Sequence, residues 1–366
     1  MSYYILPKIN NQIEINPSTT LNEELLKIYV SNSVLYYIDS LKKQITSNIL
    51  LLNDVSYNNY NDLTRIVNPS EYIFSKVPGS KYSVSKLKPQ SNFFYDMLEI
   101  CTSLNVFDIY ENVQINSLHI TPNATDTIEC FEMLRETHND NITSYLTFEN
   151  VENKYDFLIL EQEYNNLDSY FKFLARSLIT IIKNQNINGL SIIKIDNSCY
   201  KPVVDFIYIL SSLYDKVYII KPNSNNVTTY EKYIVCKNYQ NKQDYNNIAQ
   251  NNLNSLVKIE NQNVISSFLD YNIPYYFLLK IDDINVIIGH QQIEYLDLIL
   301  NILKNKNKDE KVESYKKTNI IKSVLWCEKY KIPCNKFSEK VNIFLPLANK
   351  LNENVEENKD INVLEL

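Results

Sequence analysis

Apolar and polar residues alternate along the middle of the chain with two different periods. Short runs rich in β-branched residues, typical of buried strands, are separated by longer stretches in which apolar residues recur every three or four positions. The runs that predict strands cover residues 114–120, 142–148, 155–161, 190–195, 216–222 and 231–238. The stretches that predict helices cover residues 93–107, 126–138, 167–184 and 202–214. This alternation predicts an α/β fold, with a mostly parallel sheet of about seven strands covered by helices on both faces.

The two ends of the chain follow a different pattern. The first 18 residues predict an extended arm, and Thr20 and Glu23 have the capping-box spacing for a helix running to Gln44. Toward the other end, residues 242–273 favour helix, and the apolar stretch 275–288 favours a strand or a buried turn. Further helices are expected over residues 291–304 and 309–330. The predicted regions are an N-terminal helical arm (1–64), a sheet domain (65–240), a C-terminal helical lobe (241–351) and a mobile acidic tail (352–366).

Composition narrows the class of protein. The chain has a formal net charge of −7 and a pI of about 5.2, so any contact with nucleic acid must be confined to a local patch. No apolar run approaches the roughly 20 residues that span a bilayer, and the start does not resemble a secretory signal. The 6 cysteines are scattered without a C-x-x-C pair, which argues against zinc or a disulfide framework. We expect a protein of the cytoplasm, or of a virion assembled there, with no membrane and no metal.

The block from Gly189 to Tyr239 carries the candidate chemistry. It reads as strand, amphipathic helix, strand, loop and strand, with Lys194 near the end of the first strand and Glu231 at the start of the last. Its second half combines Lys-Pro, a loop of Ser, Thr and Asn, and the strand EKYIVCKN. A lysine held near carboxylates can assist the deprotonation of a hydroxyl, so the pair marks a candidate site. A plain structural ion pair is the alternative.

Together with the segments 68–100 and 325–337, this block resembles the FtsJ-like RNA ribose 2′-O-methyltransferases, in style nearest to those of large cytoplasmic DNA viruses. The resemblance covers residues 65–335. It implies a Rossmann-like methyltransferase fold, S-adenosylmethionine as cofactor and a Lys–Asp–Lys–Glu tetrad. Lys194 matches the second lysine of that tetrad, and Glu231 matches its glutamate.

The chain departs from the family at the other site positions. Asp96, in the helix FFYDMLEI, stands where the family has the first lysine, and Glu161 replaces the aspartate. The Gly-rich loop that holds the cofactor after the first strand is replaced by residues other than glycine: Pro122, Asn123, Ala124 and Thr125. Side chains at 124–126 would enter the space of the cofactor, and a residue other than glycine at positive φ costs about 1–2 kcal/mol.

These departures predict that methyl transfer is lost. Carboxylates at 96, 161 and 231 around Lys194 would raise its pKa and leave an ammonium that is a poor base. We expect a pseudoenzyme without a cofactor, retained with a protein partner as a structural or binding subunit of a viral particle or of an RNA-capping or transcription complex. Two alternatives stay open: an active S-adenosylmethionine-dependent mRNA cap or RNA ribose 2′-O-methyltransferase, and an RNA-binding module without catalysis.

For RNA, the sequence offers a lysine-bearing strip around residues 76–88. Its lysines are Lys76, Lys81, Lys86 and Lys88. Aromatic residues beside them are candidates for stacking on bases: Tyr72, Phe74 and Tyr82. The alternative interpretation of the strip is a solvated loop.

Several single residues have simple interpretations. Asp96 could be a solvated residue near a helix start, where its charge suits the helix dipole. His119 and Trp326 are expected in the core. His138 and His290 have no partners at metal-ligand spacing.

Overall fold

The computed structural model of the protein describes residues 2–11, 13–51, 60–75, 83–148, 151, 153–240, 253–254, 263–304 and 308–335. Residues 1–334 form one compact unit, which holds every helix and strand described below. The strands are β1 (Ser2–Ile5), β2 (Ser18–Thr20), β3 (Asn116–Ile120), β4 (Asn141–Tyr145), β5 (Tyr155–Leu160), β6 (Gln185–Ile195), β7 (Tyr214–Lys221), β8 (Lys232–Tyr239) and β9 (Val264–Ser267). The helices are α1 (Asn32–Leu51), α2 (Tyr60–Val67), α3 (Phe93–Ser103), α4 (Ala124–Leu134), α5 (Leu167–Asn184), α6 (Lys201–Leu213), α8 (Tyr275–Lys304) and α9 (Lys308–Lys329).

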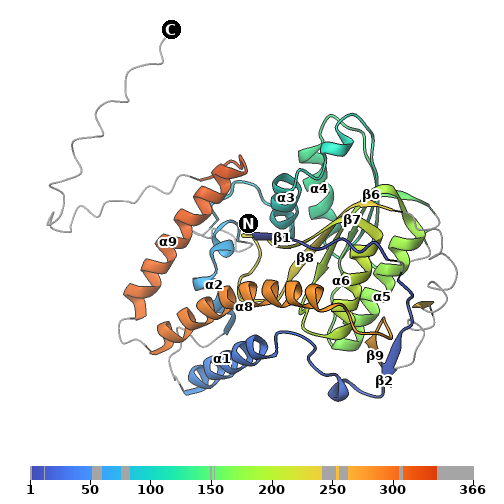
Figure 1. The fold of residues 1–366 in the computed structure, drawn as a ribbon. Helices are drawn as coiled ribbons and strands as arrows, with labels where there is room; N and C mark the ends of the chain where they lie inside the picture. Colours follow the sequence, from blue (N-terminus) through green and yellow to red (C-terminus); the bar gives the residue numbers. More distant parts are fainter. Residues whose placement is uncertain are drawn as a thin grey trace, which may run out of the picture. The chain divides into compact units, whose positions relative to one another are not determined.

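Seven strands form the central sheet, in the order β1-β7-β8-β6-β5-β3-β4. The neighbours β4, β3, β5 and β6 run parallel, while β8 is antiparallel to both β6 and β7, and β1 adds an antiparallel edge beside β7. Figure 1 shows this sheet with helices on either side. The predicted α/β class, a mostly parallel Rossmann-like sheet covered on both faces, is therefore confirmed.

Alternate residues of each buried strand face two different layers of helices. In β5, Leu158 and Leu160 belong to the core shared with α5, α6 and the first half of α8. Phe157 and Ile159 belong to the core shared with α3, α4 and the end of α9. Both faces of the strand are apolar because both are covered, as expected for a buried parallel strand.

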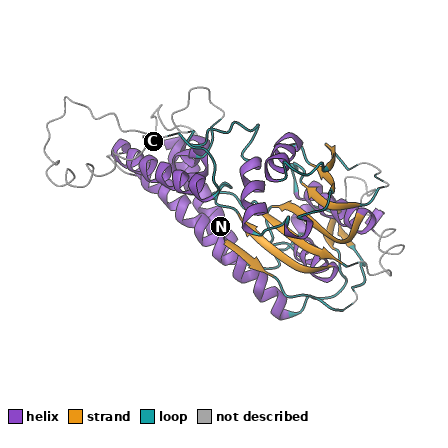
Figure 2. Ribbon diagram, turned by 90° about the horizontal axis from the view of Figure 1, so that it is seen from above, coloured by secondary structure: helices purple, strands orange, loops and turns teal. Residues whose placement is uncertain are grey.

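A third apolar cluster lies away from the sheet, among α1, α2, α8 and α9. Figure 2 shows the strands gathered on one side of the unit and a group of helices on the other, with one long helix that extends alongside the strands. Gly289 lets α1 and α8 approach closely, since a Cβ built there would lie 2.3 Å from Cγ1 of Val34.

The helix predicted from Thr20 to Gln44 is wrong at its start. Residues Ser18–Thr20 form β2, which pairs with β9, and Ser18 Oγ lies 2.7 Å from Ser267 Oγ, 249 residues away in sequence. A short 3-10 turn covers Glu23–Leu25, and α1 begins only at Asn32. Strand pairing with a distant segment outweighs the local capping signal, because that signal contributes only about 1 kcal/mol.

The strand or turn predicted over residues 275–288 is also wrong, since these residues form the first half of α8. Phe277, Ile281, Ile284 and Ile288 are buried at helical spacing. The predicted helix over 291–304 is the continuation of the same helix. The helix predicted over 242–273 is wrong at 264–267, which form β9, and most of its remainder lies outside the described residues.

The other predicted elements of the sheet domain are present with shifted ends, and the helix over 167–184 has the predicted bounds. The division into arm, domain, lobe and tail stays a prediction.

We predict that Gly289→Ala destabilises the protein when residue 34 is valine and stabilises it when residue 34 is alanine. Alanine gains about 1 kcal/mol of helix propensity over glycine, but its Cβ would clash with the stiff, β-branched Val34, and overpacking costs about 1–3 kcal/mol. The single variant should therefore be destabilised in urea unfolding. In a Val34→Ala background the substitution should stabilise, because the next atoms lie 3.6 Å or more from the new Cβ. The same sign in both backgrounds would contradict this packing.

Candidate functional site

The candidate site lies where the carboxyl ends of β3, β5 and β6 meet. The chain passes from β3 to β4 on one side and then to β5 on the other, so the strand order reverses at β3. In open α/β sheets, ligands bind beyond the strand ends at such a reversal. Thr121 follows β3, Glu161 follows β5, and Lys194 is the penultimate residue of β6.

Lys194 contacts two of the other three predicted tetrad residues directly. Lys194 Nζ lies 3.0 Å from Glu161 Oε1 and 3.4 Å from Glu231 Oε1. The Glu161 side chain is only 5% exposed, while that of Glu231 is 38% exposed. The ammonium also lies over the Phe93 ring, 5.8 Å from its centroid. The arrangement is a lysine held between two carboxylates, one buried and one open to solvent.

Burial acts to lower the pKa of Lys194, but the charges of Glu161 and Glu231 outweigh it and raise the pKa above its ordinary value. The sequence predicted this direction. At neutral pH Lys194 is an ammonium without a free electron pair, which suits a structural cation better than a general base.

Asp96 is buried rather than solvated, so the simple interpretation of this residue is wrong. It is 3% exposed, and its carboxylate accepts hydrogen bonds from Ser224 Oγ at 2.6 Å, Asn225 Nδ2 at 2.8 Å and Tyr233 Oη at 2.7 Å. Burial raises its pKa to about 6, while these donors and the charge of Lys194 act in the opposite direction. Where the resemblance implies a cation, this chain has a carboxyl group that accepts hydrogen bonds from the loop after β7 and from β8.

The segment after β3 is folded onto Glu161. Thr121 Oγ1 donates a hydrogen bond to Glu161 Oε2, and Asn123 Nδ2 donates to the same oxygen at 3.2 Å. Thr121 Oγ1 in turn accepts from the backbone N–H of Asn123 at 2.9 Å. Both carboxylate oxygens of Glu161 are therefore engaged, one by Lys194 and one by the segment that the resemblance assigns to the cofactor.

The predicted backbone strain in this segment is absent, because Asn123 has φ −103° and α4 begins immediately at Ala124. The described residues other than glycine with positive φ lie elsewhere: Ser31, Asn105, Asn188, Asn238 and Lys331. Of the four predicted loop residues, Asn123 contacts the tetrad position Glu161, while Pro122 and Thr125 are exposed.

The first turn of α4 is closed by a neighbouring segment. Asp126 is fully buried and accepts hydrogen bonds from the backbone N–H groups of Gln90 and Ser91, at 2.8 Å and 3.1 Å, and from Ser91 Oγ. A carboxylate suits the positive end of a helix dipole. The N-terminus of α4, which would face an anionic or polar ligand, is therefore already occupied by the Asp126 carboxylate.

A cavity of about 500 Å³ opens beside the exposed carboxylate of Glu231. Its lining includes Lys42 of α1, Tyr60 of α2, Asp196 and Tyr230. Lys42 Nζ lies 4.8 Å from the centroid of the Tyr230 ring. This space is large enough for a small ligand.

Sequence reasoning missed Lys221, which organises the loop between β7 and β8. It is 6% exposed, and its Nζ donates to Asn225 Oδ1 at 2.6 Å, Asn226 O at 2.8 Å and Glu231 O at 2.6 Å. Burial lowers its pKa to about 7. The loop that Lys221 holds also supplies two of the donors to Asp96. The sequence analysis noted Lys221 as part of the Lys-Pro pair before the loop, but nothing in the sequence pattern gave this lysine a role.

The structure corrects part of the predicted RNA-facing strip. Tyr72 and Phe74 are buried and therefore cannot stack on bases. Lys86 and Lys88 are exposed, and the Lys86 backbone N–H donates to Pro333 O at 2.8 Å. The remaining members lie outside the described residues: Lys76, Lys81 and Tyr82.

His119 and Trp326 are buried, as the sequence predicted. In the part of the chain that the structure describes, no three His, Cys, Asp or Glu side chains are grouped as a metal ion would require. Over the same ranges, no helix has both the length and the apolar character to cross a membrane.

No protein-family model and no curated protein matches this chain. Among solved structures, a similar one is a Plasmodium falciparum protein provisionally named a ribosomal RNA methyltransferase. The two chains share 14% sequence identity with a TM-score of 0.33, and the match covers 41% of this chain and 98% of that one. A likeness at this level carries no argument about chemistry, so function has to be argued from the geometry of the site.

We predict that Lys194→Met destabilises the protein by about 3 kcal/mol or more, because it leaves the buried Glu161 carboxylate without its cation. The matched control is Lys316→Met, which removes a cation paired at 2.7 Å with the 63% exposed Glu313 and should cost less than about 1 kcal/mol. Urea unfolding of both variants measures the difference. Equal losses would show that Lys194 is not the structural cation of this cluster.

We also predict a pH dependence of stability from Asp96. Its native pKa of about 6 lies above the ordinary 3.8, so the folded state takes up this proton first as pH falls. The stability contributed by the carboxyl is present at low pH and is lost as pH rises through about 6. The free energy of unfolding of the wild type minus that of Asp96→Asn should therefore decrease between about pH 4 and pH 7. A difference that increases over this range would contradict the raised pKa.

Proposed function

We propose that this chain is a methyltransferase-fold protein that no longer transfers methyl groups and is retained as a binding or structural subunit. The observation that carries the proposal is the engagement of Glu161 by Thr121 and Asn123, from the segment where the resemblance implies the methyl donor. A bound donor would have to displace these two hydrogen bonds to a buried carboxylate.

The residues present do not fit S-adenosylmethionine. The turn after β3 has no glycine at which the backbone could approach a ligand closely. Asp126, at the start of α4, already accepts three hydrogen bonds from Gln90 and Ser91. The reacting end of the site offers a protonated Lys194 and a buried Asp96 in place of a base and a second cation.

A protein partner is supported by exposed aromatic residues on two long helices. Tyr36 and Tyr37 of α1 are 70% and 62% exposed, and Tyr275 and Tyr276 of α8 are 73% and 55% exposed. Tyrosines are enriched where proteins bind one another. We propose that such a partner belongs to a viral particle or to a complex that caps or transcribes RNA.

An active RNA 2′-O-methyltransferase is the second candidate, favoured by the convergence of Lys194, Glu161 and Glu231. The exposed Lys86 and Lys88 support the third, RNA binding without catalysis. The cavity beside Glu231 would receive the substrate in either case.

The test is calorimetric titration of S-adenosylmethionine and S-adenosylhomocysteine into the full chain. We expect no heat of binding at millimolar ligand. In the Thr121→Ala/Asn123→Gly double variant, which frees one oxygen of Glu161, we expect binding to become stronger than in the wild type. Wild-type binding at tens of micromolar, followed by methyl transfer to capped RNA, would replace the proposal by the active enzyme.

A further inference from the structure

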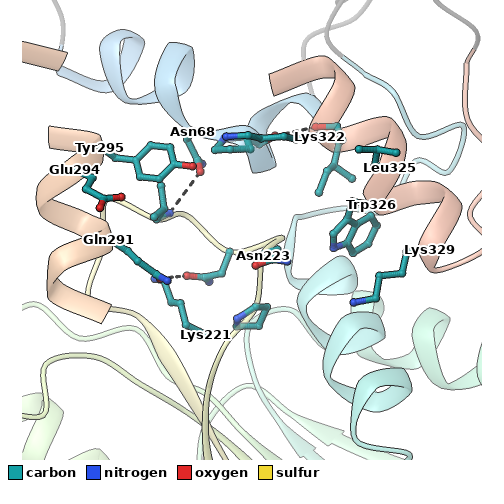
Figure 3. Close-up of a pocket in the computed structure, with 16 residues that line it drawn as sticks. Asn68, Lys221, Asn223, Gln291, Glu294, Tyr295, Lys322, Leu325, Trp326 and Lys329 are labelled. Atoms are coloured by element: carbon teal, nitrogen blue, oxygen red, sulfur yellow. Dashed lines mark hydrogen bonds between the residues drawn. The ribbon is translucent and has the colours of Figure 1, made fainter. Parts of the chain in front are cut away.

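A second cavity, of about 530 Å³, lies on the other side of the loop that follows β7. Four residues of that loop line it from below, Pro222, Asn223, Asn225 and Val227, and α8 and α9 line it from the sides (Figure 3). The cavity beside Glu231 uses other residues of the same loop, Asn226 and residues 228–231. The loop held by Lys221 is thus a shared wall between two cavities, and nothing above assigns a ligand to this second one.

This cavity is positively charged in a protein that is acidic as a whole. Three lysines line it, Lys221, Lys322 and Lys329, against one glutamate, Glu294. Lys322 and Lys329 are exposed at the rim, while Lys221 is buried at the floor. Within the described ranges, neither Lys322 nor Lys329 is found in an ion pair, whereas the Lys221 ammonium is engaged by hydrogen bonds within its own loop. A concave surface with unpaired positive charge attracts anions.

Aromatic rings line the same cavity, beside these lysines. Trp326 lies between Lys322 and Lys329 at helical spacing on α9, so all three side chains share one stripe of the helix. Tyr295 of α8 lines the cavity too, with Lys322 Nζ 6.0 Å from its ring centroid. Figure 3 shows Tyr295 and Trp326 on opposite sides, with the amides of Asn223 and Gln291 beneath them. Rings beside amides offer flat apolar contact and hydrogen bonds to a polar heterocycle.

The walls are held in place by hydrogen bonds outside the cavity's open space. Trp326 Nε1 donates to the buried Glu99 at 2.8 Å, and Ser323 Oγ donates to Pro69 O at 3.0 Å, which fixes α9. Asn68 Oδ1 accepts from the Val227 backbone N–H at 3.4 Å. A site whose walls are already ordered loses less conformational entropy on binding.

We propose that this cavity binds a nucleotide, with its phosphates at Lys322 and Lys329 and its base against the ring of the half-buried Tyr295. The combination of cations, rings and amides in one space fits a phosphorylated heterocycle better than a simple anion or an apolar ligand. The ligand is either a free nucleotide or one unit of an RNA strand, since both present the same chemistry. The inference does not rest on the proposed loss of methyl transfer, because the site shares no residue with the Lys194 cluster.

The chain contains a single tryptophan, so its fluorescence reports directly on this cavity. The probe is ADP titrated into the full chain, with adenosine and inorganic pyrophosphate as partial ligands. We expect a saturable change in Trp326 fluorescence with ADP, and binding roughly tenfold weaker or worse for adenosine and for pyrophosphate. Because S-adenosylmethionine is not used, this result is independent of the methyl-donor titration.

Variants separate the cavity from general electrostatics. Lys322→Gln/Lys329→Gln should weaken ADP binding roughly tenfold or more. The control Lys316→Gln/Lys317→Gln, on the same helix and with the same change of charge, should stay within about twofold. Tyr295→Leu keeps every charge and should weaken ADP without affecting pyrophosphate. Thermal unfolding checks that each variant is folded.

Three results would overturn the proposal. They are no fluorescence change at millimolar ADP, equal weakening by the two lysine pairs, and pyrophosphate binding as tightly as ADP, which would mean an anion site only. A single-stranded RNA oligonucleotide that displaces ADP identifies an RNA strand as the source of the nucleotide. If ADP binds and the RNA does not displace it, the ligand is a free nucleotide.

Discussion

The buried carboxylate of Glu161 joins the segments that meet at the carboxyl edge of the sheet. One oxygen accepts from Lys194 at the end of β6, the other accepts from Thr121 and Asn123 after β3, and the Glu161 backbone N–H donates to Ile120 O at 2.8 Å. A buried carboxylate needs both a cation and hydrogen-bond donors to offset its lost hydration. The geometry of the strand ends therefore follows from how this one charge is compensated.

Because Lys194 compensates the charge of Glu161, it has a structural role, and so has the neighbouring Asp96. Lys194 is protonated because two carboxylates face it, and Asp96 is occupied by three donors, two of them from the loop after β7. Lys221, which directly precedes this loop, also holds it by donating hydrogen bonds to Asn225 Oδ1 and Glu231 O. The positions that resemble a catalytic tetrad thus form a connected network of polar groups, in which the Asp96 and Glu161 carboxylates are buried and the Glu231 carboxylate is exposed. Such networks make a structure rigid when every member is satisfied.

Much of the sheet could be predicted from the sequence, because its strands are apolar on both faces and its helices have a clear period. The helix over 167–184 is an example, with the capping box of Asn166 and Ser169 at its start. The segments 18–20 and 275–288 could not be predicted. The first pairs with a strand about 250 residues away, and the second has apolar residues on its exposed side as well, including Tyr275 and Ile287. Distant strand pairing overrides the local signal in the first segment, and exposed apolar residues obscure the helical period in the second.

The sequence by itself determined the fold class and the placement of Lys194 and Glu231 at strand ends. These follow from residue type and periodicity, which act within a few positions of the chain. Only the tertiary structure decided that Asp96 is buried, that Thr121 and Asn123 engage Glu161, and that the loop held by Lys221 separates two cavities. Burial, hydrogen-bond partners and cavities depend on segments that meet from far apart in the sequence, and no local pattern specifies which segments those are.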